Sequence, residues 1–365
     1  MSGAVEQHPS GDAVRAPKLA PRSARSRLAR LGVLIALAGM TVLATVTIPG
    51  FLTPGNLTTI LLHVSINAVL ALGMTFVIVT AGIDLSVGSI VALCGVLAAK
   101  TLTSATLLGA VGPIGAAALA VAVGFGVGAG VGALNGSAVA YLRVAPFIVT
   151  LATMTIARGT ARLVTGGIPV GYPDPGAPAY EAKVAALDVL HGLGGGRIPL
   201  PGLPGGFPVP ALVMIAVIAA GAFVLTRTRF GRYVYAVGGN EEASRLSGVP
   251  VPRVKLAVYS MSGACSGLAA VLLLGQLRSG GPDAGTFYEL NAIAAAVIGG
   301  TSLLGGTGSA WGTLVGALLL GVLNNALDLL GVQAFWQEIA KGGIILLAVL
   351  FDVWVTRTSA AAATK

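Results

Sequence analysis

Residues 31–48 read LGVLIALAGMTVLATVTI, and they open a longer run, residues 31–83, that contains no Asp, Glu, Lys or Arg. One transmembrane helix requires roughly 20 consecutive apolar residues. The run is long enough for two such helices, and the turn residues Pro49 and Gly50 mark the point where the first should end. The strands of a transmembrane β-barrel alternate apolar and polar residues in segments of about ten, so the continuous apolar run favours helices instead.

The same pattern continues along the chain. Four more stretches lack charged residues: 101–142, 198–226, 256–277 and 290–327. Hydrophobic residues make up 55% of the sequence and charged residues only 10%. A soluble domain carries about 25% charged residues, and a disordered chain needs low hydrophobicity, so both classes are excluded. We therefore predict an all-α polytopic integral membrane protein.

About ten transmembrane helices fit this pattern, some of them short or broken. The expected spans are residues 31–48, 58–79, 85–99, 113–134, 146–164, 209–225, 256–277, 290–304, 311–330 and 336–355. Two Gly-bounded breaks, residues 80–89 and 298–307, each precede a Leu-Asn pair. Transporters often carry internal repeats with broken helices at matching positions, so these breaks suggest a weak internal repeat.

The basic residues cluster before the first span, in residues 227–255 and at the end of the chain. Cytoplasmic loops of membrane proteins collect Lys and Arg. We therefore expect both termini and the 227–255 loop to be cytoplasmic and residues 166–208 to form an external loop. Residues 1–29 are expected to be a disordered cytoplasmic tail, 30–356 the transmembrane domain, and 357–365 a second tail. The net charge of +9 then reflects topology, and no nucleic-acid partner is expected.

Residues 81–89 place a carboxylate, two hydroxyls and two glycines between apolar runs. Asp84 and Ser86 could line a transport path at a helix break, because Ser can satisfy freed backbone groups in a membrane. The alternative is an ordinary turn in which Asp84 caps the following helix.

Other polar residues fall within or beside the expected spans. They are Arg158, Glu289, Asn67, Asn135, Asn291 and Asn324. Intramembrane charges are costly and often functional, whereas amides often bond a neighbouring helix. The spans hold no chain of acidic and His residues that would suggest a proton relay. Cys94 and Cys265 lie apart in apolar runs, so no metal site is expected, and no phosphate-binding loop that ends in Lys-Ser or Lys-Thr is present.

A short helix is expected within the basic loop, over residues 241–247. Asn240 is a good N-cap, and Glu241 and Glu242 would sit at the positive end of the helix dipole. Gly248 suits the left-handed conformation that ends a helix. An isolated helix this short is marginal in water, so it must pack on a partner protein or on its own membrane domain.

The chain resembles the membrane permease subunits of bacterial ABC sugar importers of the ribose, xylose and galactose type. The resemblance rests on residues 73–89, 134–136, 146–159, 229–232 with 236–240, 289–306 and 323–325. The stretch Gly-Ile-Asp-Leu-Ser-Val-Gly at residues 82–88 is the most specific of them. The resemblance implies a multi-pass protein of the bacterial cytoplasmic membrane that does no covalent chemistry and contains no catalytic residue.

The resemblance also implies partners. In this family a cytoplasmic coupling helix with the pattern Glu-Ala-Ala, three residues, then Gly docks on an ABC ATPase subunit, and here Ser replaces the second Ala. The coupling residues would be Gly231, Arg232, Asn240, Glu241, Glu242, Ala243, Ser244 and Gly248. The translocation path would include Asn67, Asp84, Ser86, Asn135, Thr150, Arg158, Glu289, Asn291 and Asn324.

A second copy of the chain, an extracytoplasmic solute-binding protein and a small sugar, most simply a pentose, complete the expected system. This chain would bind no cofactor, and ATP with Mg²⁺ would bind the partner ATPase. Relatives with the same architecture could carry a nucleoside, a branched-chain amino acid or a signalling furanose. A protein of another class, a solo ion-coupled transporter, would use Asp84 or Glu289 as an ion ligand.

Overall fold

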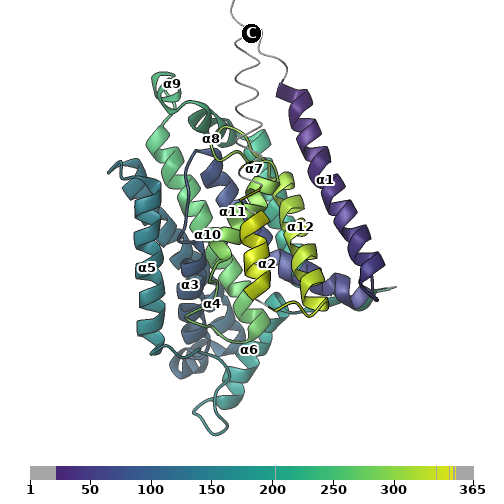
Figure 1. Cartoon of the computed structure of the whole chain (residues 1–365). Helices are drawn as coiled ribbons and strands as arrows, with labels where there is room; N and C mark the ends of the chain where they lie inside the picture. The colour runs from purple at the N-terminus through teal and green to yellow at the C-terminus, as the bar shows by residue number, and fades with distance from the viewer. Residues whose placement is uncertain (1–21, 202, 334, 345, 348–349, 351–365) are drawn as a thin grey trace, which may run out of the picture.

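A computed structural model of the chain describes residues 22–350 apart from 202, 334, 345, 348 and 349, with side chains from residue 32 onward. The described residues form a helical bundle with one two-stranded antiparallel hairpin (Figure 1). The helices are α1 (Arg22–Thr47), α2 (Pro54–Val79), α3 (Val87–Leu102), α4 (Ala105–Ala140), α5 (Pro146–Thr165), α6 (Tyr180–Gly194), α7 (Val209–Arg227), α8 (Arg229–Gly239), α9 (Glu241–Leu246), α10 (Val251–Leu277), α11 (Tyr288–Ile298) and α12 (Ala310–Leu329). The strands are β1 (Arg197–Leu200) and β2 (Leu203–Pro208).

The prediction of an all-α polytopic membrane protein is confirmed. Six helices are long and apolar enough to cross a membrane: α2, α4, α5, α7, α10 and α12. Residues 32–47 of α1, together with α3 and α11, are apolar but shorter. Residues 335–344 are helical where the last span was expected, and part of that span lies outside the described residues.

Helix α1 begins earlier than expected. Residues 22–29, assigned above to the N-terminal tail, are helical, whereas residues 1–21 and 351–365 lie outside the described residues. Once a helix exists, each further residue adds a hydrogen bond without a new nucleation step. The Arg, Ala and Leu residues that precede the apolar run all have high helix propensity, so the helix continues beyond it.

The expected loop at residues 166–208 contains regular structure that the sequence reading missed. Helix α6 packs against α4 and α10 through three buried side chains, Ala186, Leu187 and Leu190. The β1–β2 hairpin follows α6, and β2 packs against α2. Residues 181–190 contain no Gly or Pro and place apolar residues on one helix face, a signal hidden by the Gly- and Pro-rich flanks.

Helix α2 is the centre of the bundle. It packs against α10, α12, α11 and α7, and 83% of its most apolar 18-residue window is buried. A helix that is apolar on all sides is stable only when other helices surround it or lipid does. In the break that follows Val79, the side chains of Thr80, Asp84 and Ser86 are buried, whereas Ala81 is exposed.

Helices α4 and α10 share the most extensive contact among the described elements, and glycines make that contact possible. Gly124, Gly128, Gly132 and Gly136 of α4 recur at intervals of four residues and are buried on one face. A Cβ on Gly128 would overlap the carbonyl oxygen of Gly263 in α10. Small residues at such intervals allow two helix backbones to approach closely in a membrane.

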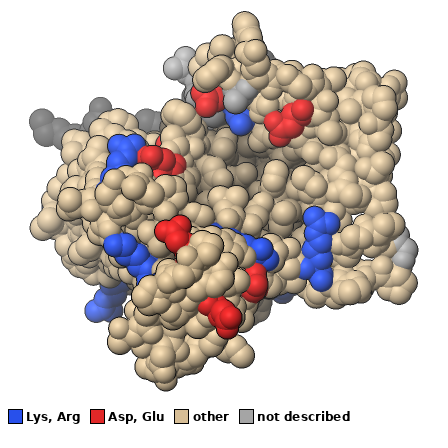
Figure 2. Space-filling model, turned by 90° about the horizontal axis from the view of Figure 1, so that it is seen from below, with Lys and Arg blue, Asp and Glu red and all other residues tan. Residues whose placement is uncertain are grey.

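The two ends of the bundle carry different structures. Helices α8 and α9 lie at the same end as the start of α1, and α6 lies at the opposite end (Figure 1). Figure 2 views the α6 end, where a few charged side chains of both signs are scattered around a hollow in a mostly uncharged surface. The structured part of the basic 227–255 loop and the 166–208 segment are therefore at opposite ends of the helices.

We predict that Gly128→Ala destabilises the bundle. The added Cβ must displace the Gly263 carbonyl, and overpacking of this kind costs about 1–3 kcal/mol. The matched control is Gly130→Ala in the same helix, because a Cβ there meets nothing within 4 Å. Thermal unfolding in mild detergent should show a lower Tm for the first variant only. Equal Tm values for the two variants would contradict the assignment of the tight contact.

Candidate functional site

Asp84 lies in the break between α2 and α3, and its side chain is fully buried. Its Oδ1 accepts hydrogen bonds from the backbone N–H of Ser86 at 3.0 Å and from the Ser86 hydroxyl at 2.6 Å. Its Oδ2 accepts a hydrogen bond from the hydroxyl of Ser262 in α10 at 2.9 Å. Buried carboxylates are tolerated only when their oxygens are bonded in this way. The carboxylate thus joins the helix break to α10.

The hydrogen-bond network extends to two further helices. The side-chain amide N–H of Asn135 in α4 donates to Ser86 Oγ at 2.9 Å. The hydroxyl of Thr153 in α5 donates to Asn135 Oδ1 at 2.6 Å. Donors and acceptors therefore run in one direction, from Thr153 to Asn135 to Ser86 to Asp84. Three of the expected path residues, Asp84, Ser86 and Asn135, come together in this network.

The alternative role of Asp84, as the residue that caps α3, differs in detail from the structure. The helix begins at Val87, its N-cap residue is Ser86, and the Ser86 side chain makes no capping bond. Asp84 instead accepts the Ser86 N–H within the turn that precedes the helix. An Asp side chain often bonds the backbone two residues further on, and this local bond competes with true capping.

The two Gly-bounded breaks lie side by side. The N–H of Gly306, in the segment between α11 and α12, donates to Val79 O at 2.9 Å. A Cβ on Gly305 would lie 2.9 Å from the Cβ of Ala81, which itself has a positive φ of 59°. On the other side of the first break, the Tyr259 hydroxyl donates to Ile83 O at 3.2 Å. Neighbouring segments therefore satisfy part of the backbone that the break frees.

Arg158 and Glu289 lie nearer the α6 end and belong to a different group. Arg158 Nη1 donates to the backbone carbonyls of Pro282 at 3.0 Å and Ala284 at 2.6 Å. One turn further along α5, Arg162 forms an exposed ion pair with Asp283 at 2.6 Å. The two arginines thus fix the segment between α10 and α11.

Glu289 stands in the first turn of α11 and packs against the first turn of α3. A Cβ on Gly88 would overlap both Glu289 Oε2 and the carbonyl oxygen of Gly285. Gly88 therefore permits a close contact between α3 and the segment that leads into α11. This contact explains why the sequence has a glycine two residues beyond Ser86.

The remaining expected path residues are dispersed. The Thr150 hydroxyl bonds Pro146 O within α5, and Asn291 is partly buried in α11. The amide oxygens of Asn67 in α2 and Asn324 in α12 are buried and have no hydrogen-bond partner among the described residues. Gln276 Oε1 in α10 and Thr301 Oγ1 after α11 are also buried and unpartnered among the described residues, so the bundle keeps a few unused acceptors. No group of three or more His, Cys, Asp or Glu in the described part of the chain could hold a metal ion.

The short helix in the basic loop forms as predicted. Asn240 Oδ1 accepts the N–H of Ala243 at 2.9 Å, and α9 covers Glu241–Leu246. Gly248 follows with a positive φ of 80°. Helix α9 projects from its end of the bundle (Figure 1). Glu241 anchors it to α10 through Lys255, with 2.7 Å between Oε2 and Nζ.

The exposed face of α9 differs from the predicted set. Leu246 is 82% exposed, and Glu242 and Ala243 are also exposed, so these residues are available to a partner. Ser244 is buried, and its hydroxyl bonds Asn240 O within the helix.

Two further residues of the predicted set lie on α8. Gly231 is buried against the end of α7, where a Cβ would overlap the carbonyls of Val224 and Leu225. Arg232 is exposed on α8.

Sequence reasoning missed several residues that complete these sites. They are Thr153, Tyr259, Ser262, Leu246 and Lys255. The spacing of Lys255, Tyr259 and Ser262, four residues and then three, could have revealed a polar stripe on one face of α10. No pattern in the sequence identifies the partners of that stripe.

Comparisons with known proteins give a consistent result. A family model described as "branched-chain amino acid transport system / permease component" matches residues 56–349. The ribose import permease protein RbsC of Escherichia coli (strain K12) is 45% identical over 319 residues, which cover 87% of this chain and 92% of that protein. RbsC of Bacillus subtilis (strain 168) is 43% identical over 323 residues, 88% of this chain and 92% of that protein. The xylose transport system permease protein XylH of Escherichia coli (strain K12) is 37% identical over 356 residues, 85% of this chain and 87% of that protein. No solved structure matches the chain.

We predict that Ser262→Ala weakens the Asp84 network. The substitution leaves Oδ2 of a buried carboxylate without its hydroxyl donor, which costs about 1–3 kcal/mol. The control is Ser266→Ala on the same helix. Ser266 is equally buried, but its hydroxyl donates to the backbone of the same helix, at Ser262 O. Thermal unfolding in detergent should give a clearly lower Tm for the Ser262 variant than for the control. If the Tm falls by the same amount in both variants, the loss does not come from the bond between Ser262 and Asp84, and the prediction is wrong.

Proposed function

The chain belongs to the branched-chain amino acid transport system permease component family, and we propose that it is the membrane-spanning subunit of an ABC importer for a pentose such as ribose or xylose. The observation that carries the substrate proposal is the identity of 37–45% to ribose and xylose permeases over at least 85% of this chain. The family model, over residues 56–349, extends from the first turn of α2 beyond the end of α12. The chain itself would do no covalent chemistry.

ATP hydrolysis in a separate subunit would drive transport. The exposed face of α9, with Leu246 at its end, supplies a docking element at the end of the bundle that carries the basic loop. The positive-inside rule favours the cytoplasm for this end, where the ATPase subunit would bind ATP and Mg²⁺. The functional unit would contain two copies of the chain in a bacterial cytoplasmic membrane.

An extracytoplasmic binding protein would supply specificity. Aromatic residues form only 5% of the chain, and most hydroxyls and amides in the bundle already bond protein groups. Asn67 and Asn324 retain free amide oxygens, which provide few contacts to a sugar with several hydroxyls. The membrane subunit would therefore be weakly selective, and the α6 end with the β1–β2 hairpin would face the binding protein.

A branched-chain amino acid is the second candidate cargo, because the description of the matching family names it. The test is uptake of labelled ribose, xylose and leucine by native cells, by cells that lack this chain and by complemented cells. Loss and recovery of pentose uptake alone would support the proposal. Loss and recovery of leucine uptake alone would replace it with the second candidate.

A solo ion-coupled mechanism makes a different prediction in the same cells. An uncoupler applied at constant ATP should spare uptake by an ABC importer and abolish uptake coupled to an ion gradient. In the second case Asp84 or Glu289 would become the candidate ion ligand. The buried hydrogen bonds of Asp84 to two serines favour the ABC mechanism, because they leave its carboxylate little capacity to coordinate an ion.

We predict that Leu246→Ser uncouples the chain from its ATPase. A leucine buried at an interface contributes about 1.5–3 kcal/mol, so association should weaken about tenfold or more and pentose uptake should fall. Gly248→Asp should have a similar effect, because its φ of 80° disfavours a residue with a Cβ at the end of α9.

Leu200→Ser is the matched control for ATPase association. Leu200 is also an exposed leucine, but it lies in β1 beyond α6. The measurement is the amount of ATPase that copurifies with tagged variants from native membranes. If the Leu246 and Gly248 variants retain the ATPase at the level of the Leu200 variant, α9 is not the docking helix.

A further inference from the structure

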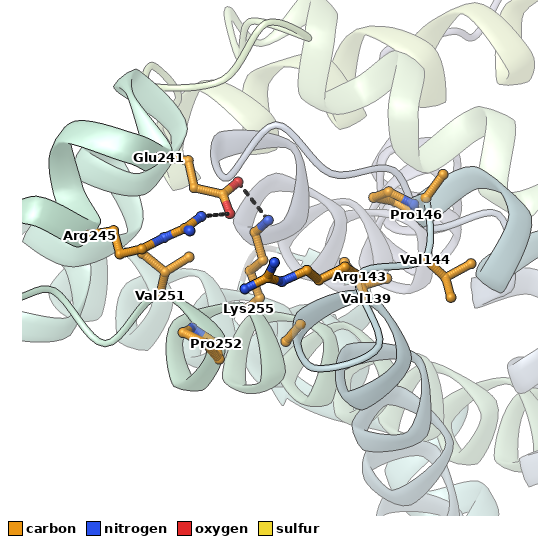
Figure 3. Close-up of a pocket in the computed structure, with 11 residues that line it drawn as sticks. Val139, Arg143, Val144, Pro146, Glu241, Arg245, Val251, Pro252 and Lys255 are labelled. Atoms are coloured by element: carbon orange, nitrogen blue, oxygen red, sulfur yellow. Dashed lines mark hydrogen bonds and ion pairs between the residues drawn. The ribbon is translucent and has the colours of Figure 1, made fainter.

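A cavity of about 520 Å³ opens beside α9. Its walls come from three places in the chain: the end of α4 with the segment that leads into α5, the start of α10, and α9 itself. Figure 3 shows Arg143, Glu241, Arg245 and Lys255 pointing toward a common space from these three segments. Neither the coupling role of α9 nor the Asp84 network accounts for this arrangement.

The charges in this cavity do not balance. Glu241 forms ion pairs with Lys255, at 2.7 Å between Oε2 and Nζ, and with Arg245, at 3.7 Å between Oε1 and Nη2. Arg245 also approaches Glu242 at 3.4 Å, on the exposed side of α9. Arg143 forms no ion pair with any described residue. One carboxylate inside the cavity therefore faces three cations, and the cavity is a site of positive potential.

The rest of the lining is apolar. Val139, Val144, Pro146, Val251 and Pro252 form the wall next to the charged groups. A cavity that is cationic on one side and apolar on the other suits an amphiphilic anion.

The depth of the cavity along the bundle narrows the choice of ligand. It lies where α4 ends at Ala140 and α5 begins at Pro146. Both helices are long and apolar enough to cross a membrane, so these ends would lie near the lipid headgroups. Basic pockets between transmembrane helices commonly receive anionic headgroups. A phosphate group has enough oxygens to accept hydrogen bonds from arginine guanidinium groups and the Lys255 ammonium at the same time. A single carboxylate has only two oxygens.

We propose that this cavity is a binding site for a phosphate oxyanion that bridges Arg143 to Lys255 and Arg245, with an anionic phospholipid headgroup or free phosphate as its source. The bound group would neutralise the repulsion among the three cations. It would also link the α4–α5 segment to α9, because Arg143 belongs to the first and Arg245 to the second.

The test measures binding to the purified full-length chain in detergent by native mass spectrometry. Three probes are titrated: dihexanoyl phosphatidylglycerol, the zwitterionic dihexanoyl phosphatidylcholine and inorganic phosphate. The wild-type chain should bind phosphatidylglycerol more tightly than phosphatidylcholine. Arg143→Gln should weaken this binding about fivefold, the effect of one cation near a headgroup, whereas Arg143→Lys should retain most of it.

The matched control is Arg253→Gln. Arg253 is an exposed basic residue in the first turn of α10 and does not line the cavity. Loss of the Arg253 charge should leave phosphatidylglycerol binding unchanged. Lys255→Gln should weaken this binding as Arg143→Gln does. Agreement between these two variants guards against a folding defect in either one.

The probes distinguish the sources. Phosphatidylglycerol binding that depends on Arg143 assigns the site to lipid, and phosphate binding that depends on Arg143 assigns it to the free ion. If neither anion shows this dependence, or if Arg253→Gln weakens binding as much, the attraction is general surface charge and the proposed site is wrong.

Discussion

The absence of water within a membrane is the constraint on which this structure depends. A helix that stops inside the bundle leaves backbone groups that only protein can satisfy. The chain stops α2 at Val79 and starts α3 at Val87, where the break packs against Gly238 of α8 and the segment between α11 and α12. Gly306 N–H, the Tyr259 hydroxyl and the Asp84 carboxylate each bond backbone in or beside this break. The glycines of α4 and α10 also help to satisfy this break, because the close contact of the two helices brings Asn135 and Ser262 within reach of Ser86 and Asp84.

Helix α10 connects this break to the surface. Lys255, Tyr259 and Ser262 follow one face of the helix, and they contact Glu241 of α9, Ile83 O and Asp84 in turn. The distance along the axis from the first to the last is roughly 10 Å, two turns of one uninterrupted helix. A displacement of α9 that acts on Glu241 would therefore move the same helix that holds the break. Under the proposed function, this stripe is a physical route by which an ATPase could act on the membrane domain.

Much of this architecture follows from the sequence. Charge-free runs identify the spans because burial of charge in lipid is so costly, and Asn240 with Gly248 identifies α9 because its capping is local. The network around Asp84 could not be predicted in the same way. Its members Thr153, Asn135, Ser86 and Ser262 lie far apart in the chain, and only tertiary packing brings them together. Helix α6 was missed because Gly- and Pro-rich flanks conceal its short apolar face, which packs on α4 and α10.

The polar groups of the bundle also bear on what it can recognise. Hydroxyls that bond a carbonyl one turn earlier, as Thr150 and Ser266 do, have already used their donor. The Asp84 network uses the donors of Ser86, Ser262, Asn135 and Thr153 in the same way. Among the buried side-chain amides of α2 and α12, the oxygens of Asn67 and Asn324 accept no hydrogen bond from a described residue. A passage lined by few free groups binds a hydroxylated solute weakly, and weak binding favours release once a conformational change opens the opposite side.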